Sequence, residues 1–462
     1  MSLNGHGSAQ SVAAVGGHPG PSSRAMSVIA RAGRAWALLR ELLRADTANP
    51  PGDESSASEI LGDFLSDEGL SAVRLDDEPG RANLLARVPG ERPGVLLTGS
   101  MDVPPPGKGW SHPPFGGVEE NGFLYGPGAL GDKAFLAMAA VAFAEASRRR
   151  LSRELILAAV ADREGGGRCG ARFLAQAHPE FLKADYMLGW SGCFAQSLGK
   201  LRLLPIGTAQ KGRLDLRLRF RGAGGGGGTH QPKAAAFMAA KALSRLIGGL
   251  PLRGCGASRV FLKEAGLRSG WRGLPMWALT SQSLAPAALA LMSEERSGRM
   301  RALLSATATP VRFEGSGVDA LTMDLSLRTL PGRSREQSLS ELWRVLGGEV
   351  EHEVLGEVPS VESSHRTPFF RHLAESVRRV FPGHEPVPCL GLHATDAAFF
   401  SRLGMECYGM SPLLFEDRDL AELPARAGGP DERVHGESFY KGYALLEESV
   451  LGFVEKKGAA AG

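Results

Sequence analysis

The sequence predicts an α/β fold, with a mostly parallel central sheet, helices on both faces of that sheet, and an inserted α+β lid domain. Two observations predict it. In the first half of the chain, continuous apolar segments at 84–88, 95–98 and 155–160 alternate with helical patterns at 134–148 and 170–182, as in parallel sheets buried on both faces. Later in the chain, apolar and polar residues alternate within segments, which is typical of half-exposed antiparallel strands.

The N-terminal part of the chain predicts a tail followed by helices. Residues 1–25 are rich in Gly, Ser, His and Pro and contain no apolar run, so we expect a disordered tail and not a signal peptide. Residues 27–44 have helical periodicity, and the two prolines and the glycine at 50–52 end that helix. A second helix is expected from about Ser55.

The length of the chain predicts more than one domain, because 462 residues are too many for a single core. We expect a discontinuous α/β domain at 26–206 and 356–462, interrupted at 207–355 by a lid that can pair with a second copy. Within the lid, segments 212–220 and 320–328 have the alternation of strands. Helix-prone stretches lie between them, and the chain ends in a long helix.

Composition excludes several classes of protein. A formal charge of +3 with 22% charged residues provides no excess of positive charge for nucleic acid or anionic membranes. The apolar runs are too short to cross a membrane. Five cysteines without a CxxC pair favour a reduced cytoplasm and no disulfide framework. We therefore expect a cytoplasmic protein that binds neither nucleic acid nor membranes.

Polar residues that follow two predicted strands form the candidate site. Ser100 and Asp102 follow one buried strand, and residues 162–164 follow another. Catalytic residues of parallel sheets lie at the carboxyl ends of strands. These two segments are therefore expected to meet at the floor of a cleft.

Four motifs in this order carry a resemblance to a known family. They are Trp110-x-x-x-Pro-Phe-x-Gly, Ala161-Asp-x-Glu-x-Gly-Gly, Leu330-Pro-Gly and Arg433-Val-His-Gly. With them, residues 27–455 resemble the di-zinc aminoacylase and carboxypeptidase family of metallopeptidases, of the succinyl-diaminopimelate desuccinylase and carnosinase type. The resemblance implies the predicted fold and a cleft that accepts a peptide or an N-acyl amino acid.

The resemblance also implies where two zinc ions would bind, and most of those positions have changed. A two-metal hydrolase needs a bridging carboxylate, further ligands on each metal and a general base. In the family these positions are, in chain order, the first histidine, the bridging aspartate, the base glutamate, the next glutamate, the third carboxylate and the last histidine. In this chain they are Ser100, Gly131, Arg163, Glu164, Trp190 and His435. Glu164 and His435 alone keep ligand side chains. We therefore expect no cofactor, with a single zinc held by Glu164, His435 and Asp132 as the alternative.

The replacements are consistent with a cleft that has lost its metals. The Arg163 guanidinium can take the place of a metal as the partner of Glu164, and Trp190 fills volume. We predict that Arg163 lies within salt-bridge reach of Glu164 or Asp102. In the family, the residue at Asp102 orients the first histidine; here it caps a loop or pairs with Arg163.

Further residues are candidates for substrate binding. Arg328 matches the family arginine that grips a substrate carboxylate, and Thr395 lies in a turn that matches the family's Gly-Thr-Asp. The lid histidine of the family falls on Gly226 within a run of five glycines, and His230 is the nearest substitute. Trp190 and Asp132 complete the set expected to line the cleft.

Three functions remain open at this point. The first is a non-hydrolytic descendant that binds a peptide or N-acyl amino acid. The second is a repurposed enzyme in which Ser100, Asp102, Arg163, Glu164 and His435 perform acyl transfer or acid-base chemistry without metal, for example in natural-product biosynthesis. The third is an amide hydrolase with one residual metal. Metal content separates the third function from the other two.

Overall fold

A computed structural model describes residues 23–198, 201–222, 231–269, 273–315, 318–415 and 426–456. The predicted disordered tail lies outside the described residues up to position 22, and α1 begins at Ser23. His230 and the five-glycine run also lie outside the described residues.

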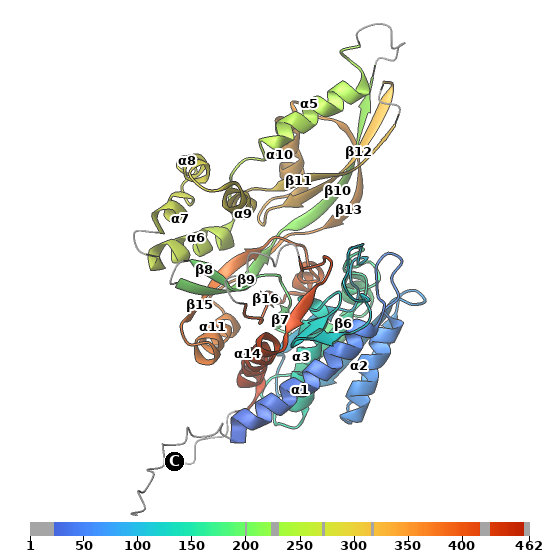
Figure 1. The fold of residues 1–462 in the computed structure, drawn as a ribbon, viewed down its shortest axis with the longest axis vertical. Helices are drawn as coiled ribbons and strands as arrows, with labels where there is room; N and C mark the ends of the chain where they lie inside the picture. Colours follow the sequence, from blue (N-terminus) through green and yellow to red (C-terminus); the bar gives the residue numbers. More distant parts are fainter. Residues whose placement is uncertain are drawn as a thin grey trace, which may run out of the picture.

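The larger sheet has ten strands, and its centre is parallel as predicted (Figure 1). Strands β6, β3, β7 and β16 run parallel to one another, whereas β1 and β2 on one side and β9 on the other join in antiparallel fashion. The strands are β1 Ala72–Asp76, β2 Ala82–Val88, β3 Val95–Ser100, β6 Leu155–Val160, β7 Tyr186–Gly189, β8 Gln196–Leu198, β9 Leu201–Gln210, β14 Val361–Glu362, β15 His384–Gly391 and β16 Glu406–Met410.

Helices cover both faces of this sheet. Helix α3 packs against α1, α14 and β3 in the largest hydrophobic core, because its run from Ala134 to Ala144 is alanine-rich, apolar and buried. The other face is covered by α4 and α12. The helices of this part are α1 Ser23–Arg44, α2 Ser55–Asp67, α3 Asp132–Ser147, α4 Ala171–Ala177, η1 Pro179–Leu182, α11 Pro368–Val380, α12 Ala397–Phe400, η3 Ser401–Leu403 and α14 Gly436–Val454.

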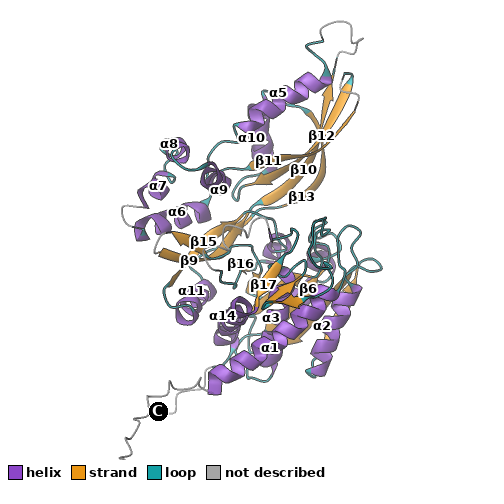
Figure 2. Cartoon of the chain, viewed as in Figure 1, coloured by secondary structure: helices purple, strands orange, loops and turns teal. Residues whose placement is uncertain are grey.

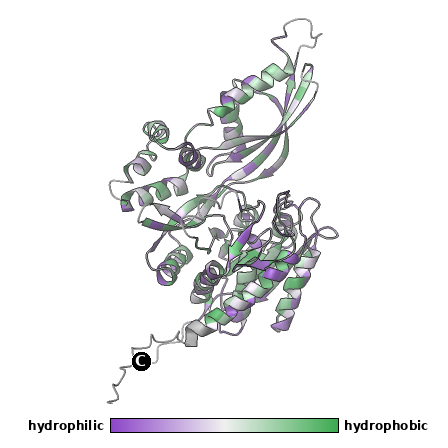
Figure 3. Ribbon diagram, in the orientation of Figure 1, coloured by the Kyte–Doolittle hydropathy of each residue, from purple (hydrophilic) through white to green (hydrophobic). Residues whose placement is uncertain are grey.

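A second, four-stranded antiparallel sheet lies apart from the first (Figure 2). The alternating segments correctly predicted β10 Gly212–Arg221 and β12 Ala320–Thr329, which pair along their whole length. Strands β11 Thr307–Gly315 and β13 Glu351–Val358 complete it at the two edges. One face packs on α5 Ala235–Ile247 and α10 Arg335–Leu346. Figure 3 shows apolar and polar residues mixed along these strands, as expected for a sheet with one covered face.

Four helices of the described residues between α5 and β11 pack elsewhere. They are α6 Gly256–Arg268, α7 Leu274–Ala278, α8 Ala285–Ala290 and α9 Glu294–Leu304. Helix α6 contacts β15 and β9 of the larger sheet, and its Phe261 and Leu262 lie in one core with Val387. This part of the segment assigned to the lid therefore rests on the larger sheet.

A small three-stranded sheet completes the fold. It joins β4 Glu119–Glu120, β5 Phe123–Tyr125 and β17 Arg433–His435. Among the described residues, no helix is both long and apolar enough to cross a membrane.

Candidate functional site

Arg163 lies at the centre of the candidate site. It follows β6, and the preceding Asp162 turns the chain through a left-handed conformation with φ of 61°. The guanidinium forms ion pairs with Asp132 and with Glu164, where Nη2 is 3.1 Å from Oε1. The predicted salt bridge to Glu164 is confirmed. The cation thus lies between two carboxylates at the floor of the site.

Trp190 covers this guanidinium. The residue follows β7, and the Arg163 Cζ lies 5.4 Å from its ring centroid. Such a contact stabilises a cation on an aromatic face. The indole Nε1 is buried and has no hydrogen-bond partner within the described part of the chain. Trp190 therefore acts as an apolar cover and not as a polar contact.

Asp102 holds the loop and does not pair with the guanidinium. Its carboxylate accepts the backbone N–H groups of Arg163 at 3.1 Å and Glu164 at 3.0 Å. The Asn49 amide donates to it at 2.9 Å. The Ser100 hydroxyl donates to Asp102 and to the Val160 carbonyl. No histidine takes part in either hydrogen bond of Ser100, so the contacts of the hydroxyl do not form a Ser-His-carboxylate set.

The site contains more acidic than basic groups. Asp102, Asp132, Glu164 and Asp396 all act on the charge of Arg163. Burial raises the pKa of Asp132, and it raises the pKa of Asp396 to about 8 although Arg163 opposes the shift. Burial lowers the pKa of Arg163, but the carboxylates more than offset it. The guanidinium therefore stays charged, and Asp396 holds a proton near neutral pH.

The backbone that carries Asp132 is fixed by a buried carboxylate from far along the chain. Glu432 accepts the N–H groups of Gly128 at 3.1 Å, Leu130 at 2.8 Å and Gly428 at 2.9 Å. Asp132 is the first residue of α3 and accepts the Ser100 N–H at 3.1 Å. These bonds hold Asp132 against Arg163.

His435 lies apart from the Arg163 cluster. It belongs to β17 and pairs in register with Phe123 of β5, whose ring is 4.8 Å away. Its Nδ1 accepts the N–H of Glu437 and so caps α14. None of these contacts reaches Glu164 or Asp132, so the structure does not bring the three alternative zinc ligands together.

Arg328 approaches the cluster from β12. Its Cα is the direct cross-strand partner of Arg213 in β10. Burial lowers the pKa of Arg328 and Arg213 lowers it further, whereas Asp215 and Glu164 act in the opposite direction. Within the described ranges, the Arg328 guanidinium has no salt bridge or hydrogen bond. A half-buried cation is therefore left available near Glu164.

A small cavity lies against the larger sheet beside Trp190. It has a volume of about 20 Å³, which is room for about one water molecule. Trp190, Ser191, Gln210, His393, Thr395 and Tyr408 contribute to its wall. Thr395 is held in place because its N–H donates to the Gln210 side chain at 3.2 Å and its carbonyl accepts from that side chain at 3.1 Å.

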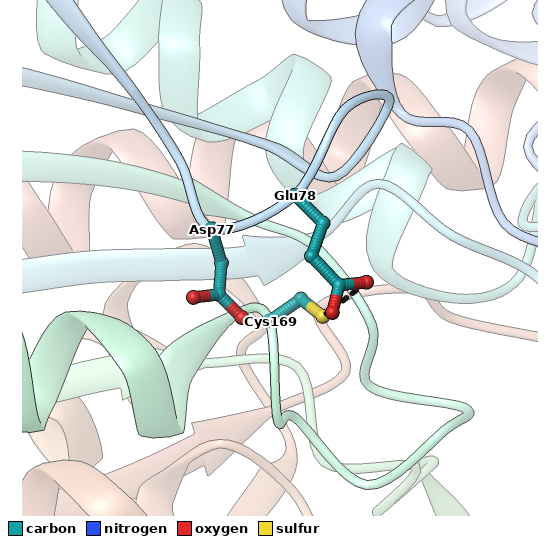
Figure 4. Close-up of side chains that lie close together, drawn as sticks. All are labelled: Asp77, Glu78 and Cys169. Atoms are coloured by element: carbon teal, nitrogen blue, oxygen red, sulfur yellow. Dashed lines mark hydrogen bonds between the residues drawn. The ribbon is translucent and has the colours of Figure 1, made fainter.

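One group of three metal-binding side chains occurs in the part of the chain that the structure describes. Asp77, Glu78 and Cys169 come close together outside the Arg163 cluster (Figure 4). Arg168 pairs with Glu78 through both oxygens, at 2.8 and 3.0 Å, and also approaches Asp77. Burial raises the pKa of the Cys169 thiol to about 12. Arg168 offsets one of the two negative charges, and the thiol is protonated.

Sequence reasoning missed several residues of the site. Asp396 is the aspartate of the turn that contains Thr395, and its charge interacts with that of Arg163. Asn49 joins Asp102 to Asp162 through its amide, at 2.9 and 3.1 Å. The turn around Thr395 is the sequence signal for Asp396, and the Thr-x-Asn-Pro-Pro-Gly break at 47–52, which also occurs in the family, is the signal for Asn49.

Comparison with known proteins identifies the family. The model for peptidase family M20/M25/M40 matches residues 96–451. A succinyl-diaminopimelate desuccinylase of Methylorubrum extorquens is 36% identical over 138 residues, which are 28% of this chain and 35% of that protein. The chain thus matches about a third of the length of this curated relative.

Solved structures show the same fold. The M20 family metallo-carboxypeptidase Sso-CP2 from Sulfolobus solfataricus superposes with a TM-score of 0.67 at 18% identity, covering 90% of this chain and 98% of that one. The di-peptidase Dug1p from Saccharomyces cerevisiae gives 0.66 at 15% identity, with 93% and 98% coverage. At such identities the likeness concerns the fold alone. Because the family model matches most of the length of this chain, the chain belongs to peptidase family M20/M25/M40.

Proposed function

We propose that this protein binds a peptide or N-acyl amino acid through its carboxylate and does not hydrolyse it with a pair of metal ions. The observation that carries the proposal is the position of Arg163. Its guanidinium lies between Asp132 and Glu164 and under the Trp190 ring. A permanent cation at this place neutralises the carboxylates that would otherwise attract a metal.

The donor atoms around Arg163 do not fit two zinc ions. Zinc in a catalytic site needs at least three nitrogen, sulfur or carboxylate ligands. At the positions implied by the family, Gly131 has no side chain, Ser100 is hydrogen-bonded to Asp102, and Trp190 offers no ligand atom. We propose that no metal-bound water forms here.

Metal content tests this proposal. Untagged protein dialysed against buffer should retain less than about 0.1 equivalent of zinc, cobalt or manganese, because fewer than three ligands converge on any point of the cluster. Inductively coupled plasma mass spectrometry on protein of known concentration measures it. One equivalent or more retained after chelation would refute the proposal and favour the hydrolase with a residual metal.

The binding part of the proposal rests on Arg328. A half-buried guanidinium without an ion pair is a costly arrangement unless an anion completes it. The carboxylate of a peptide or an N-acyl amino acid matches its planar donors. The curated relatives are named for succinyl-diaminopimelate, which carries such groups, so this compound and simple dipeptides are the first probes to test.

Arg328→Ala should weaken binding of such a probe by about 2 to 4 kcal/mol, or roughly 30- to 900-fold in Kd. Isothermal titration calorimetry with N-succinyl-diaminopimelate or Ala-Gly measures the loss. Arg335→Ala is the matched control, since Arg335 is an exposed lid arginine paired with Glu357. A methyl ester of the same probe should bind the Arg328→Ala variant and the unchanged protein equally well. An unchanged affinity for the free acid would contradict this role.

The repurposed enzyme remains the competing function. It predicts turnover of an acyl or amide substrate by metal-free protein and its loss in Ser100→Ala. Because the Ser100 hydroxyl bonds to Asp102 and to a backbone carbonyl, we favour the binding function. Hydrolysis or acyl transfer by chelator-treated protein would reverse this preference.

We further propose that the lid at 207–355 joins two copies of the chain. Strand β11 is an edge of the second sheet, and its Val311 and Phe313 are 69% and 49% exposed. Unpaired edges with exposed apolar residues are prone to pair with another strand. Light scattering should give a mass near twice 48.9 kDa, and Val311→Pro should halve it. A monomer at micromolar concentration would contradict the proposal.

A further inference from the structure

Two of the five cysteines lie with their sulfur atoms in contact. The Sγ atoms of Cys193 and Cys389 are 2.7 Å apart, with the Cys389 thiol donating to Cys193, although the residues are 196 positions apart in sequence. Each of the other three thiols lies against an oxygen atom and not against sulfur. The fold therefore selects one pair.

The two thiols belong to separate parts of the larger sheet. Cys193 lies in the segment at 190–195 that follows β7 and begins with Trp190. Cys389 lies in β15, which leads into the turn that contains Thr395 and Asp396. Strands β16 and β9 lie between β7 and β15. A bond between these sulfurs would join the segment that covers Arg163 to the strand behind the cavity.

We propose that Cys193 and Cys389 are a redox site whose reversible disulfide locks the 190–195 segment against β15. Disulfide formation would bring the sulfurs from 2.7 Å to about 2.05 Å, a change within reach of side-chain rotation. A buried contact between two thiols without a covalent bond is unusual for structural cysteines, which normally pack as small apolar side chains. Transient disulfides of this kind also occur in reducing compartments.

The reaction balances with a peroxide as the oxidant. The Cys193 thiolate attacks one peroxide oxygen, forming a sulfenic acid and releasing hydroxide, which takes up the thiol proton to give water. Cys389 then attacks that sulfur, the S–S bond forms, and the sulfenic oxygen leaves with the Cys389 proton as a second water. Two thiols and one hydrogen peroxide become one disulfide and two water molecules.

The environment supports this order of attack. The hydrogen bond from Cys389 lowers the pKa of the Cys193 thiol against the effect of burial, and burial raises the pKa of Cys389. Cys193 is 7% exposed and Cys389 is 5% exposed, so a small oxidant reaches Cys193 more readily than a bulky disulfide does. Cys193 is the attacking thiol, and Cys389 resolves the sulfenic acid.

The disulfide would fix two segments of the cavity wall relative to each other. Trp190 and Ser191 from one segment and Gly391, His393 and Thr395 from the other all contribute to the cavity wall. Joining residues 193 and 389 limits the separation of these two segments. Movement of Trp190 away from the Arg163 guanidinium would then be slower in the oxidised protein.

Thiol counting and hydrogen exchange test the proposal. After treatment with a small excess of hydrogen peroxide, denatured protein should titrate three thiols instead of five, and dithiothreitol should restore all five. Tandem mass spectrometry should find the peptides of Cys193 and Cys389 linked. Amide exchange across 190–195 should slow at least about threefold in the oxidised protein. Neither readout involves a ligand, so the test is independent of the proposed function.

Matched variants separate this pair from general oxidation. Cys193→Ser should keep all four of its remaining thiols under the same treatment, whereas Cys407→Ser, which removes a buried thiol in contact with backbone oxygens, should fall from four to two. Five thiols remaining in the unchanged protein, a link between other cysteines, or unchanged exchange at 190–195 would overturn the proposal. Peptide mapping of the unchanged protein decides the question even if a variant fails to fold.

Discussion

Replacing Arg163 with methionine should lower the free energy of unfolding by about 3 to 5 kcal/mol at pH 8, the cost of removing one partner from a buried ion pair. The guanidinium pairs with Asp132 and Glu164, and its side chain is only 16% exposed. Methionine keeps most of the volume and leaves the carboxylates without their cation. Urea denaturation followed by circular dichroism measures the change.

The loss of stability in Arg163→Met should become larger as the pH rises. Burial already raises the pKa of Asp132 and Asp396 in the folded protein, and loss of the cation raises both further. Between about pH 4 and pH 8 the unfolded chain then carries fewer protons than the folded one, so stability falls as pH rises. The variant should therefore be closer to the unchanged protein at pH 5 than at pH 8.

Arg168→Met is the control for this variant. Arg168 also pairs with an acidic side chain, but its own side chain is 62% exposed, and exposed ion pairs contribute little to stability. A loss of less than about 1 kcal/mol in Arg163→Met, or an equal loss in the two variants, would show that Arg163 does not neutralise a buried cluster.

The general architecture could be predicted because periodicity reflects burial. Continuous apolar segments became the central strands β3 and β6, and alternating segments became β10 and β12. The edge strand β11 was not predicted, because its residues are exposed at least in part along its whole length and Pro310 interrupts it. Exposed strands show only a weak alternation of apolar and polar residues.

The site could be predicted where residues lie next to clear motifs. The Arg163–Glu164 salt bridge follows from two neighbouring residues at the end of a strand. The contact between Arg163 and Asp132 depends instead on where α3 begins. The position of His435 depends on how the long stretch between β16 and β17 is aligned, and residues 416–425 of it lie outside the described ranges. Spacing alone does not fix such a stretch.

Combining Ser100→His, Gly131→Asp, Arg163→Glu and Trp190→Asp should give a protein that binds about one equivalent of zinc, whereas Arg163→Glu alone should bind less than about 0.1 equivalent. In the single variant a new carboxylate faces Glu164 without a cation, and one of them takes up a proton. The combined variant supplies a histidine and three carboxylates beside Glu164 and removes the arginine and the tryptophan.

The space around Gly131 is sufficient for the Gly131→Asp substitution in the combined variant. A Cβ added at Gly131 would have its nearest neighbour, Gly128 Cα, at 3.8 Å, an ordinary contact. We expect one zinc and not two, because His435 lies on β17 against Phe123 and does not reach the cluster.

The stoichiometry is measured by mass spectrometry of the metal after dialysis, and His435→Ala in the combined variant is the control that should leave it unchanged. Zinc bound by Arg163→Glu alone, or a second equivalent that depends on His435, would show that the loss of metal rests on fewer residues than the geometry around Arg163 implies.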